Sequence, residues 1–294
     1  MDLDELIGMS RKYGSDPDYV LAGGGNTSCK EEGVMAVKAS GYALAAIEED
    51  GFVLMDVRKL LMMMDADYPE GDKEREALAL RGLMAARLDR KDGKRPSVEC
   101  IMHALFPFRY VLHLHPALIN GLACSRNGAA EAAAIFADVK GIFLWIPLSK
   151  PGYTLSKECA SLFAGHESAH GRHPSIVLLQ NHGVFVAADS VRDIDGLMAD
   201  VVSRISKRIV RQPDPVKDVA IYMEGRENEG LHPSAIPFTP DHVVYRDSFP
   251  LVADSVKVKT YSESFGGPLV LPEDFIRFIE NWESESYRQK QVLR

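Results

Sequence analysis

Cysteine is scarce in this chain, and an excess of basic residues is missing. There are four cysteines in 294 residues, widely separated and without a C-x-x-C pair. This argues against a disulfide-rich secreted scaffold and indicates a reduced, cytoplasmic protein. The 34 basic and 42 acidic residues give a net charge of −8. We therefore expect neither nucleic acid nor an anionic membrane surface as a partner.

Long apolar runs are missing as well. None reaches the roughly 18 residues that a membrane-spanning helix requires. The first residues are acidic and periodic, unlike the basic start and apolar core of a signal peptide. Because 46% of the residues are hydrophobic, the chain can still bury a sizeable core, in one large domain or two modest ones.

Short apolar runs and helical patterns make up most of the sequence. The spacing of apolar residues predicts a helix over 2–13, and the capping-box pattern of Ser190 to Asp193 predicts another that ends near Arg211. Strands are predicted over 19–22, 33–38, 51–57, 110–116, 141–147, 175–179 and 183–188. Since these elements lack a regular βαβ rhythm, we expect a three-layer α/β/α fold with a mixed, mostly antiparallel central sheet.

One proline-rich segment, residues 212–215, indicates a boundary. We expect residues 1–212 to form the main domain and residues 213–294 to form an extension packed on it, because about 80 residues fold alone only marginally. In the extension the pattern predicts a short helix, strands near 241–258 and a final amphipathic helix over 272–290.

Three histidines are candidate metal ligands. His113 and His115 lie on the predicted strand 110–116, so their side chains share one face, about 6.5 Å apart along the strand. His182 follows another predicted strand and precedes a glycine. Three imidazoles with an open fourth position are typical of a catalytic zinc site.

A glutamate joins this set. Pro96 and Ser97 indicate the start of a helix, on which Glu99 and His103 lie one turn apart. An alternative stands beside the metal site: a lone histidine on an apolar strand is more often a hydrogen-bonded core residue, and His-x-His by itself leaves both interpretations balanced. The presence of Glu99 and His182 favours the metal site.

Two glycine-containing turns can bind an anion. Three glycines at 23–25 let backbone N–H groups converge, and the following Asn26, Thr27 and Ser28 add neutral donors. The segment matches neither a Walker nor a Rossmann fingerprint, and a plain flexible turn explains it equally well when it stands alone. The second turn is at 39–41.

Five motifs occur in order along residues 20–212: Gly25-Asn-Thr-Ser28, Ser40-Gly41, Ser97-Val-Glu99 with His103, His113-Leu-His115 and Asn181-His182-Gly183. Together they resemble the class II aldolase/adducin family. Residues 13–28 and the Thr-Pro-Asp-His motif at 239–242 are similar to the aldolase half of bifunctional rhamnulose-phosphate aldolase/alcohol dehydrogenases. No dinucleotide fingerprint follows residue 212, so we do not expect the dehydrogenase activity.

The resemblance implies a catalytic domain over residues 1–212. Its His113, His115 and His182 would hold Zn²⁺, or another divalent ion such as Mn²⁺. A divalent ion stabilises the negative charge that forms when the carbon–carbon bond beside a carbonyl breaks. Glu99 would ligate the ion in the absence of substrate and otherwise act as acid and base. The substrate phosphate would bind at Gly25, Asn26, Ser40, Gly41 and Ser97.

The implied activity is cleavage of a ketose phosphate, such as a 6-deoxyketose 1-phosphate, into dihydroxyacetone phosphate and an aldehyde. Epimerisation or decarboxylation of a sugar phosphate on the same metal is an alternative, and an adducin-like binding module is the alternative from another class. The resemblance also implies a homotetramer. The family's proton-donating tyrosine has no motif match here, and Tyr153, Tyr261 and Tyr287 are candidates.

Overall fold

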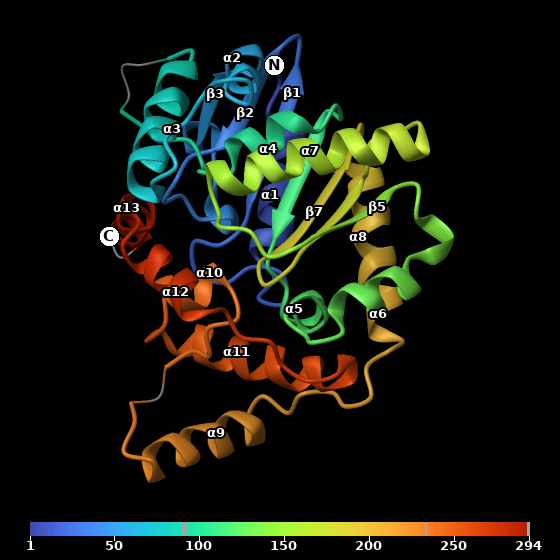
Figure 1. The fold of residues 1–294 in the computed structure, drawn as a ribbon, viewed down its shortest axis with the longest axis vertical. Helices are drawn as coiled ribbons and strands as arrows, with labels where there is room; N and C mark the ends of the chain where they lie inside the picture. The colour runs from blue at the N-terminus through green and yellow to red at the C-terminus, as the bar shows by residue number, and fades with distance from the viewer. Residues whose placement is uncertain (90–92, 233, 293–294) are drawn as a thin grey trace.

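The computed structural model describes residues 1–89, 93–232 and 234–292, and it contains a central sheet of seven strands (Figure 1). The strands lie in the order β3-β2-β1-β4-β7-β6-β5. Their bounds are β1 (Asn26–Glu31), β2 (Val34–Lys38), β3 (Phe52–Asp56), β4 (Tyr110–Leu114), β5 (Phe143–Ile146), β6 (Ile176–Leu179) and β7 (Gly183–Ala188). Only β5 and β6 pair in parallel among these strands. The predicted mixed, mostly antiparallel sheet is confirmed.

Helices cover both faces of the sheet, which makes three layers. One face carries α1 (Asp4–Gly14), α5 (Ala117–Ala123), α6 (Gly128–Ile135) and α8 (Val191–Ser206). The other carries α2 (Val57–Met62), α3 (Asp72–Ala86), α4 (Cys100–Leu105) and α7 (Tyr153–His170).

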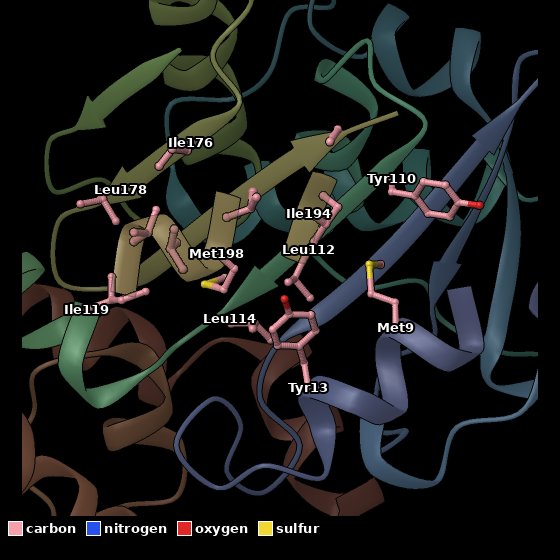
Figure 2. Packing of buried hydrophobic residues seen from close by; sticks show 14 of the residues in the cluster. Met9, Tyr13, Tyr110, Leu112, Leu114, Ile119, Ile176, Leu178, Ile194 and Met198 are labelled. Carbon is pink, nitrogen blue, oxygen red and sulfur yellow. The ribbon is translucent and has the colours of Figure 1, made fainter. Parts of the chain in front are cut away.

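Strand β4 supplies both the core and the polar site. Tyr110, Leu112 and Leu114 point into the layer of α1 and α8, as Figure 2 shows. Each buried aliphatic side chain of this kind contributes about 1.5–3 kcal/mol. The alternate residue His113 points to the opposite face, where its ring stacks on Phe185 with centroids 3.9 Å apart. Alternation along one strand thus places an imidazole beneath α4.

Residues 19–22 and helix α8 in the main domain differ from the prediction. Residues 19–22 form turns and not a strand, because Asp16 organises the segment locally. The Asp16 carbonyl accepts hydrogen bonds from the N–H groups of Tyr19 and Val20, and its carboxylate accepts one from the N–H of Asp18. Helix α8 begins at the predicted Ser190 cap but ends at Ser206, before the predicted end near Arg211.

The extension is helical. Its elements are α9 (Lys217–Asn228), α10 (Pro240–Val244), α11 (Phe249–Ser262), α12 (Glu273–Glu280) and α13 (Glu283–Val292). The strands predicted near 241–258 are therefore wrong, and the single final helix predicted over 272–290 is two helices. The cause is tertiary: α11 packs so closely on α5 that a Cβ at Gly121 would lie 2.2 Å from the Cβ of Tyr261. A buried, apolar, β-branched run accommodates either conformation, and the facing helix decides.

The extension contacts the main domain through a small apolar cluster of Ala117, Cys124, Phe238 and Val258. The domain boundary at residue 212 stays a prediction. In the part of the chain that the structure describes, we find no helix with the length and apolarity needed to cross a bilayer.

Candidate metal centre

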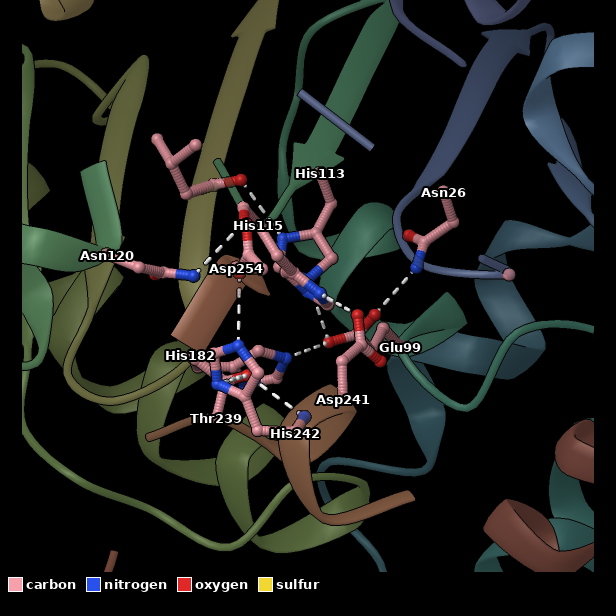
Figure 3. Close-up of polar contacts among 12 residues, drawn as sticks. Asn26, Glu99, His113, His115, Asn120, His182, Thr239, Asp241, His242 and Asp254 are labelled. Carbon is pink, nitrogen blue, oxygen red and sulfur yellow. Dashed lines mark hydrogen bonds and ion pairs between the residues drawn. The ribbon is translucent and has the colours of Figure 1, made fainter. Parts of the chain in front are cut away.

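The three predicted histidines meet at one end of the sheet (Figure 3). His113 lies on β4, His115 directly follows that strand, and His182 lies in the turn between β6 and β7. One ring nitrogen of each lies within 4.8 Å of the others. The Nε2 atoms of His113 and His115 are only 2.8 Å apart.

Outer hydrogen bonds fix which nitrogen of two rings faces inward. The Nδ1 atom of His113 lies 3.0 Å from the carbonyl oxygen of Val184, and that of His115 lies 2.6 Å from Oδ2 of Asp241. Because a carbonyl or carboxylate oxygen accepts, each Nδ1 carries the proton. In the neutral rings two Nε2 lone pairs then face each other, which a cation between them would stabilise. Such outer N–H bonds are typical of metal-binding histidines.

The protonation states also suit a metal. Burial lowers the pKa of His113 to about 4, so its ring is neutral at pH 7, the form that binds metal ions. For Glu99, burial raises the pKa, but the neighbouring His113 and His182 outweigh it and hold the pKa well below its usual range. The site therefore combines the neutral His113 imidazole with the ionised carboxylate of Glu99.

Glu99 faces the histidines from the N-terminus of α4. The helix begins at Cys100, later than predicted, so Glu99 lies at its N-cap position. Its Oε1 lies 3.1 Å from Nε2 of His113 and 2.9 Å from Nε2 of His182, yet this buried atom makes no hydrogen bond of acceptable geometry. A carboxylate oxygen so placed, together with three imidazole nitrogens, fits the tetrahedral donor set of a divalent ion such as zinc.

His103 supports Glu99 and is not a fourth imidazole ligand in this cluster. Its Nε2 donates to Oδ1 of Asn26, and the Ser28 hydroxyl donates to its Nδ1 over 2.7 Å. The Asn26 amide then donates to Oε2 of Glu99 over 2.6 Å. Burial first, and the nearby Lys30 second, hold the pKa of His103 well below its usual range, so the ring stays neutral. This chain of bonds fixes the carboxylate.

A cavity beside the histidines contains most of the predicted anion-binding residues. Gly25, Asn26, Ser40 and Ser97 line it, but Gly41 does not. Gly41 instead occupies the turn next to Ser40, with a φ of +92° that favours glycine.

Three charged residues at this site were missed from the sequence. Lys38, at the end of β2, and Glu285, on α13, line the same cavity, and Asp241 bonds to His115. Lys38 is 3% exposed and its ammonium donates to the carbonyl of Gly23 over 3.3 Å. The position of Lys38 just before the turn at 39–41 was a sequence signal for a residue of this site. The Thr-Pro-Asp-His motif was such a signal for Asp241. Glu285 had none.

The sequence matches the model of the class II aldolase and adducin N-terminal domain over residues 4–202. The chain belongs to the class II aldolase/adducin family. The predicted family resemblance is confirmed. A relative from Bacillus subtilis (strain 168), named uncharacterized oxidoreductase YuxG, is 33% identical over 194 residues, which are 62% of this chain and 26% of that protein. The chain thus spans about a quarter of the length of this curated relative.

One solved structure of the family agrees with this chain in fold. The N-terminal class II aldolase domain of a conserved Thermoplasma acidophilum protein is 29% identical, with a TM-score of 0.59, and the match covers 70% of this chain and 93% of that one. L-fuculose-1-phosphate aldolase from Thermus thermophilus is 17% identical with a TM-score of 0.43, over 79% of this chain and 100% of that one. We draw no conclusion from the second, weaker likeness.

Proposed function

We propose that the protein is a metal-dependent aldolase. It would cleave a ketose phosphate, such as a 6-deoxyketose 1-phosphate, into dihydroxyacetone phosphate and an aldehyde. The main support for this proposal is the cluster of three imidazole nitrogens, with those of His113 and His182 also within 3.1 Å of Oε1 of Glu99, and with Nδ1 of His113 and His115 protonated toward the outside. Membership of the family supports an enzyme of the aldolase, epimerase or decarboxylase type.

The proposed metal ligands are His113, His115 and His182, with Glu99 as the fourth ligand in the absence of substrate. A bound Zn²⁺, or another divalent ion such as Mn²⁺, supplies a Lewis acid that stabilises negative charge on the substrate oxygens. This donor set favours an enzyme over an adducin-like module without catalysis, because such a module has no use for a buried, ionised carboxylate beside a cluster of imidazoles.

Glu99 is the proposed acid and base. In the cleavage, the hydroxyl on the carbon that becomes the aldehyde would give up its proton to a general base, the bond from that carbon would break, and the electron pair would stay on the carbon beside the carbonyl. That carbon must then gain a proton, and Glu99 is the carboxylate held at the site to carry it. The Asn26 amide fixes Oε2 and leaves Oε1 directed to the reacting side.

The phosphate would bind in the adjoining cavity. Neutral donors come from Gly25, Asn26, Ser40 and Ser97, with Gly41 shaping the turn. Lys38 is the one Lys or Arg among the described residues that line this cavity, and its charge suits a phosphate dianion. We further propose, from family membership alone, a cytoplasmic homotetramer.

Metal content and a substrate screen test the proposal. Purified protein should contain about one zinc or similar divalent ion per chain. It should release aldehyde from a panel of 6-deoxyketose 1-phosphates, and metal-stripped protein should not. If no aldehyde is released, inversion of a sugar carbon would instead identify an epimerase, and release of carbon dioxide would identify a decarboxylase. Protein without bound metal and without turnover would contradict an enzyme of any of these kinds.

A further inference from the structure

Asp241 connects the C-terminal extension to the histidine cluster. It lies on α10, beyond the residues 4–202 that match the family domain. Its Oδ2 lies 2.6 Å from Nδ1 of His115, and the two side chains are 7% and 11% exposed. Figure 3 shows the Asp241 carboxylate beside the imidazoles.

The surrounding chain is shaped to hold this carboxylate. The side chain of Thr239 caps α10 by accepting from the N–H of His242, and Pro240 begins the helix. On the other side, a Cβ at Gly24 would lie 2.6 Å from Oδ2 of Asp241. The middle glycine of the triplet 23–25 therefore leaves room for a carboxylate from the extension, a purpose separate from anion binding.

A second bond ties the extension to the site. The Asn181 amide donates to the carbonyl oxygens of Phe238 and Leu269, over 3.0 and 2.7 Å. Asn181 has a φ of +54° and immediately precedes His182. Two of the three histidines are thus positioned by contacts with residues after 212.

We propose that Asp241 is a positioning residue of the metal centre, which keeps the proton on Nδ1 of His115 and so directs Nε2 to the ion. The proposal rests on the metal site of the proposed function. A carboxylate partner on Nδ1 also makes Nε2 of the imidazole a stronger electron-pair donor to the ion than a neutral carbonyl partner does. Loss of such an outer partner typically weakens metal binding about 10- to 100-fold. The C-terminal extension, which the family domain does not include, then completes the site.

The extension offers a matched control. Asp254 lies 3.0 Å from Nε2 of His242, and both side chains are buried. This is a second histidine–aspartate pair in the same helical extension, but His242 is not part of the cluster of three. Replacing either aspartate with asparagine removes one charge from one buried pair.

The experiment compares Asp241→Asn with Asp254→Asn in the full chain. Each protein is stripped of metal, and its zinc affinity is measured by competition with a chelator. Zinc should bind about 10- to 100-fold more weakly to Asp241→Asn, and within about twofold of the original affinity to Asp254→Asn. The visible spectrum of the Co²⁺-loaded protein, which reports ligand geometry, should change only in Asp241→Asn.

A double-mutant cycle separates positioning from a general structural role. In a His115→Ala background, Asp241→Asn should weaken zinc binding by less than about twofold further, because the ring that it orients is gone. An equal loss in both backgrounds would overturn the proposal. If Asp241→Asn does not fold, Gly24→Ala, which pushes on the carboxylate without removing it, should weaken zinc binding in the same direction.

The remaining outcomes are distinct. Equal zinc affinity and an unchanged cobalt spectrum in Asp241→Asn would overturn this inference and leave the proposed function standing. Equal losses in Asp241→Asn and Asp254→Asn would also overturn it. Zinc binding that depends on Asp241, in a protein that cleaves no sugar phosphate, would support the inference and overturn the aldolase proposal. Failure of the unmodified protein to bind any divalent ion would overturn both.

Discussion

The two ends of the cavity are built differently. The metal end consists of His113, His115, His182 and Glu99. Here at least three of the four side chains are held by a second, outward hydrogen bond: His113 and His115 donate to an oxygen of a neighbouring residue, and Glu99 accepts from the Asn26 amide. The anion end consists of Gly25, Asn26, Ser40, Ser97, Lys38 and Glu285. It combines neutral donors with charges of opposite sign, one from a strand and one from the last helix.

This difference in construction predicts which kinetic parameter, kcat or KM, depends on each end of the cavity. Groups that are held rigidly before substrate arrives stabilise the transition state and so affect kcat. Groups that bind a remote phosphate affect KM more, since they contact the substrate and the transition state alike. Changes at the metal end should therefore lower kcat, and changes at the anion end should move KM.

The largest effect is expected for His113→Ala. Loss of one of three imidazoles should release the metal and lower kcat/KM by on the order of 10³-fold or more, because several kcal/mol of charge stabilisation is lost. Metal analysis and steady-state kinetics check this. His170→Ala, at an exposed histidine on α7, is the control and should keep its metal. Unchanged occupancy in His113→Ala would show that His113 only packs.

Glu99→Gln should separate binding from chemistry at the metal end. The amide keeps the shape, and three imidazoles remain, so the metal should stay bound. Turnover should fall by about 10²- to 10⁴-fold, because the proton carrier is gone. The comparison of metal content with kcat in one preparation tests this. Full activity in the variant would remove Glu99 from its proposed role.

The metal end should also destabilise the metal-free protein in acid. The pKa of His113 is lowered from 6.5 to about 4 by burial, so the unfolded chain binds a proton that the folded chain excludes. The free energy of unfolding should thus fall by about 3 kcal/mol as the pH drops from about 6.5 to 4. Glu99, with its lowered pKa, acts in the same direction at still lower pH. Urea unfolding of the metal-free protein at a series of pH values measures this. If the free energy of unfolding of His113→Gln fell as steeply with pH as that of the original protein, the prediction would be contradicted.

Lys38→Met tests the anion end. Removing the ammonium should raise KM about 10- to 100-fold for a phosphorylated substrate, the usual range for a hydrogen bond to a charged group. The change in kcat should be smaller. The unphosphorylated ketose is the control substrate, for which the variant and the original protein should have similar KM values. Equal losses with both substrates would show that Lys38 supports the fold and does not bind phosphate.

The smallest effect is expected for Glu285→Gln. This change removes a negative charge from the cavity and should lower KM for the phosphorylated substrate by about two- to fivefold, the size of a partly screened charge interaction. It should leave kcat near its original value, whereas the same kind of change at the metal end, Glu99→Gln, should lower kcat strongly. Competition with inorganic phosphate gives a second measurement, and tighter phosphate binding is expected. A large fall in kcat would break the division between the two ends.

Much of the site was predictable because its signals are local. Alternation along β4 and its continuation put His113 and His115 together without knowledge of the fold. Periodicity alone does not bring Glu99 and His182 to that pair, since both are distant in sequence, and for them the order of motifs was needed. The sheet followed from short apolar runs of strand length, rich in Val and Ile and bounded by glycine or proline, which favour strands.

The unpredicted parts depend on distant contacts. Asp241 meets His115 across 126 residues, and the Thr-Pro-Asp-His motif marks the residue without showing which ring its side chain contacts. Residues 241–258 are apolar enough for strands, but Thr239 caps α10 and α11 packs closely on α5, so these residues are helical. Glu285 reaches the cavity through the fold of the last two helices alone. All three features depend on tertiary packing, which local sequence patterns do not describe.

Strand β4 limits how this protein can be re-engineered. Its alternate residues have two separate roles, the apolar layer through Leu112 and Leu114 and the polar site through His113. A deletion or insertion of one residue would turn leucines toward the cavity and the imidazole toward the apolar layer. Libraries that seek new substrates should therefore keep the length of β4 and diversify the cavity wall at α13, where Ser284 and Glu285 border the cavity from the far end of the chain.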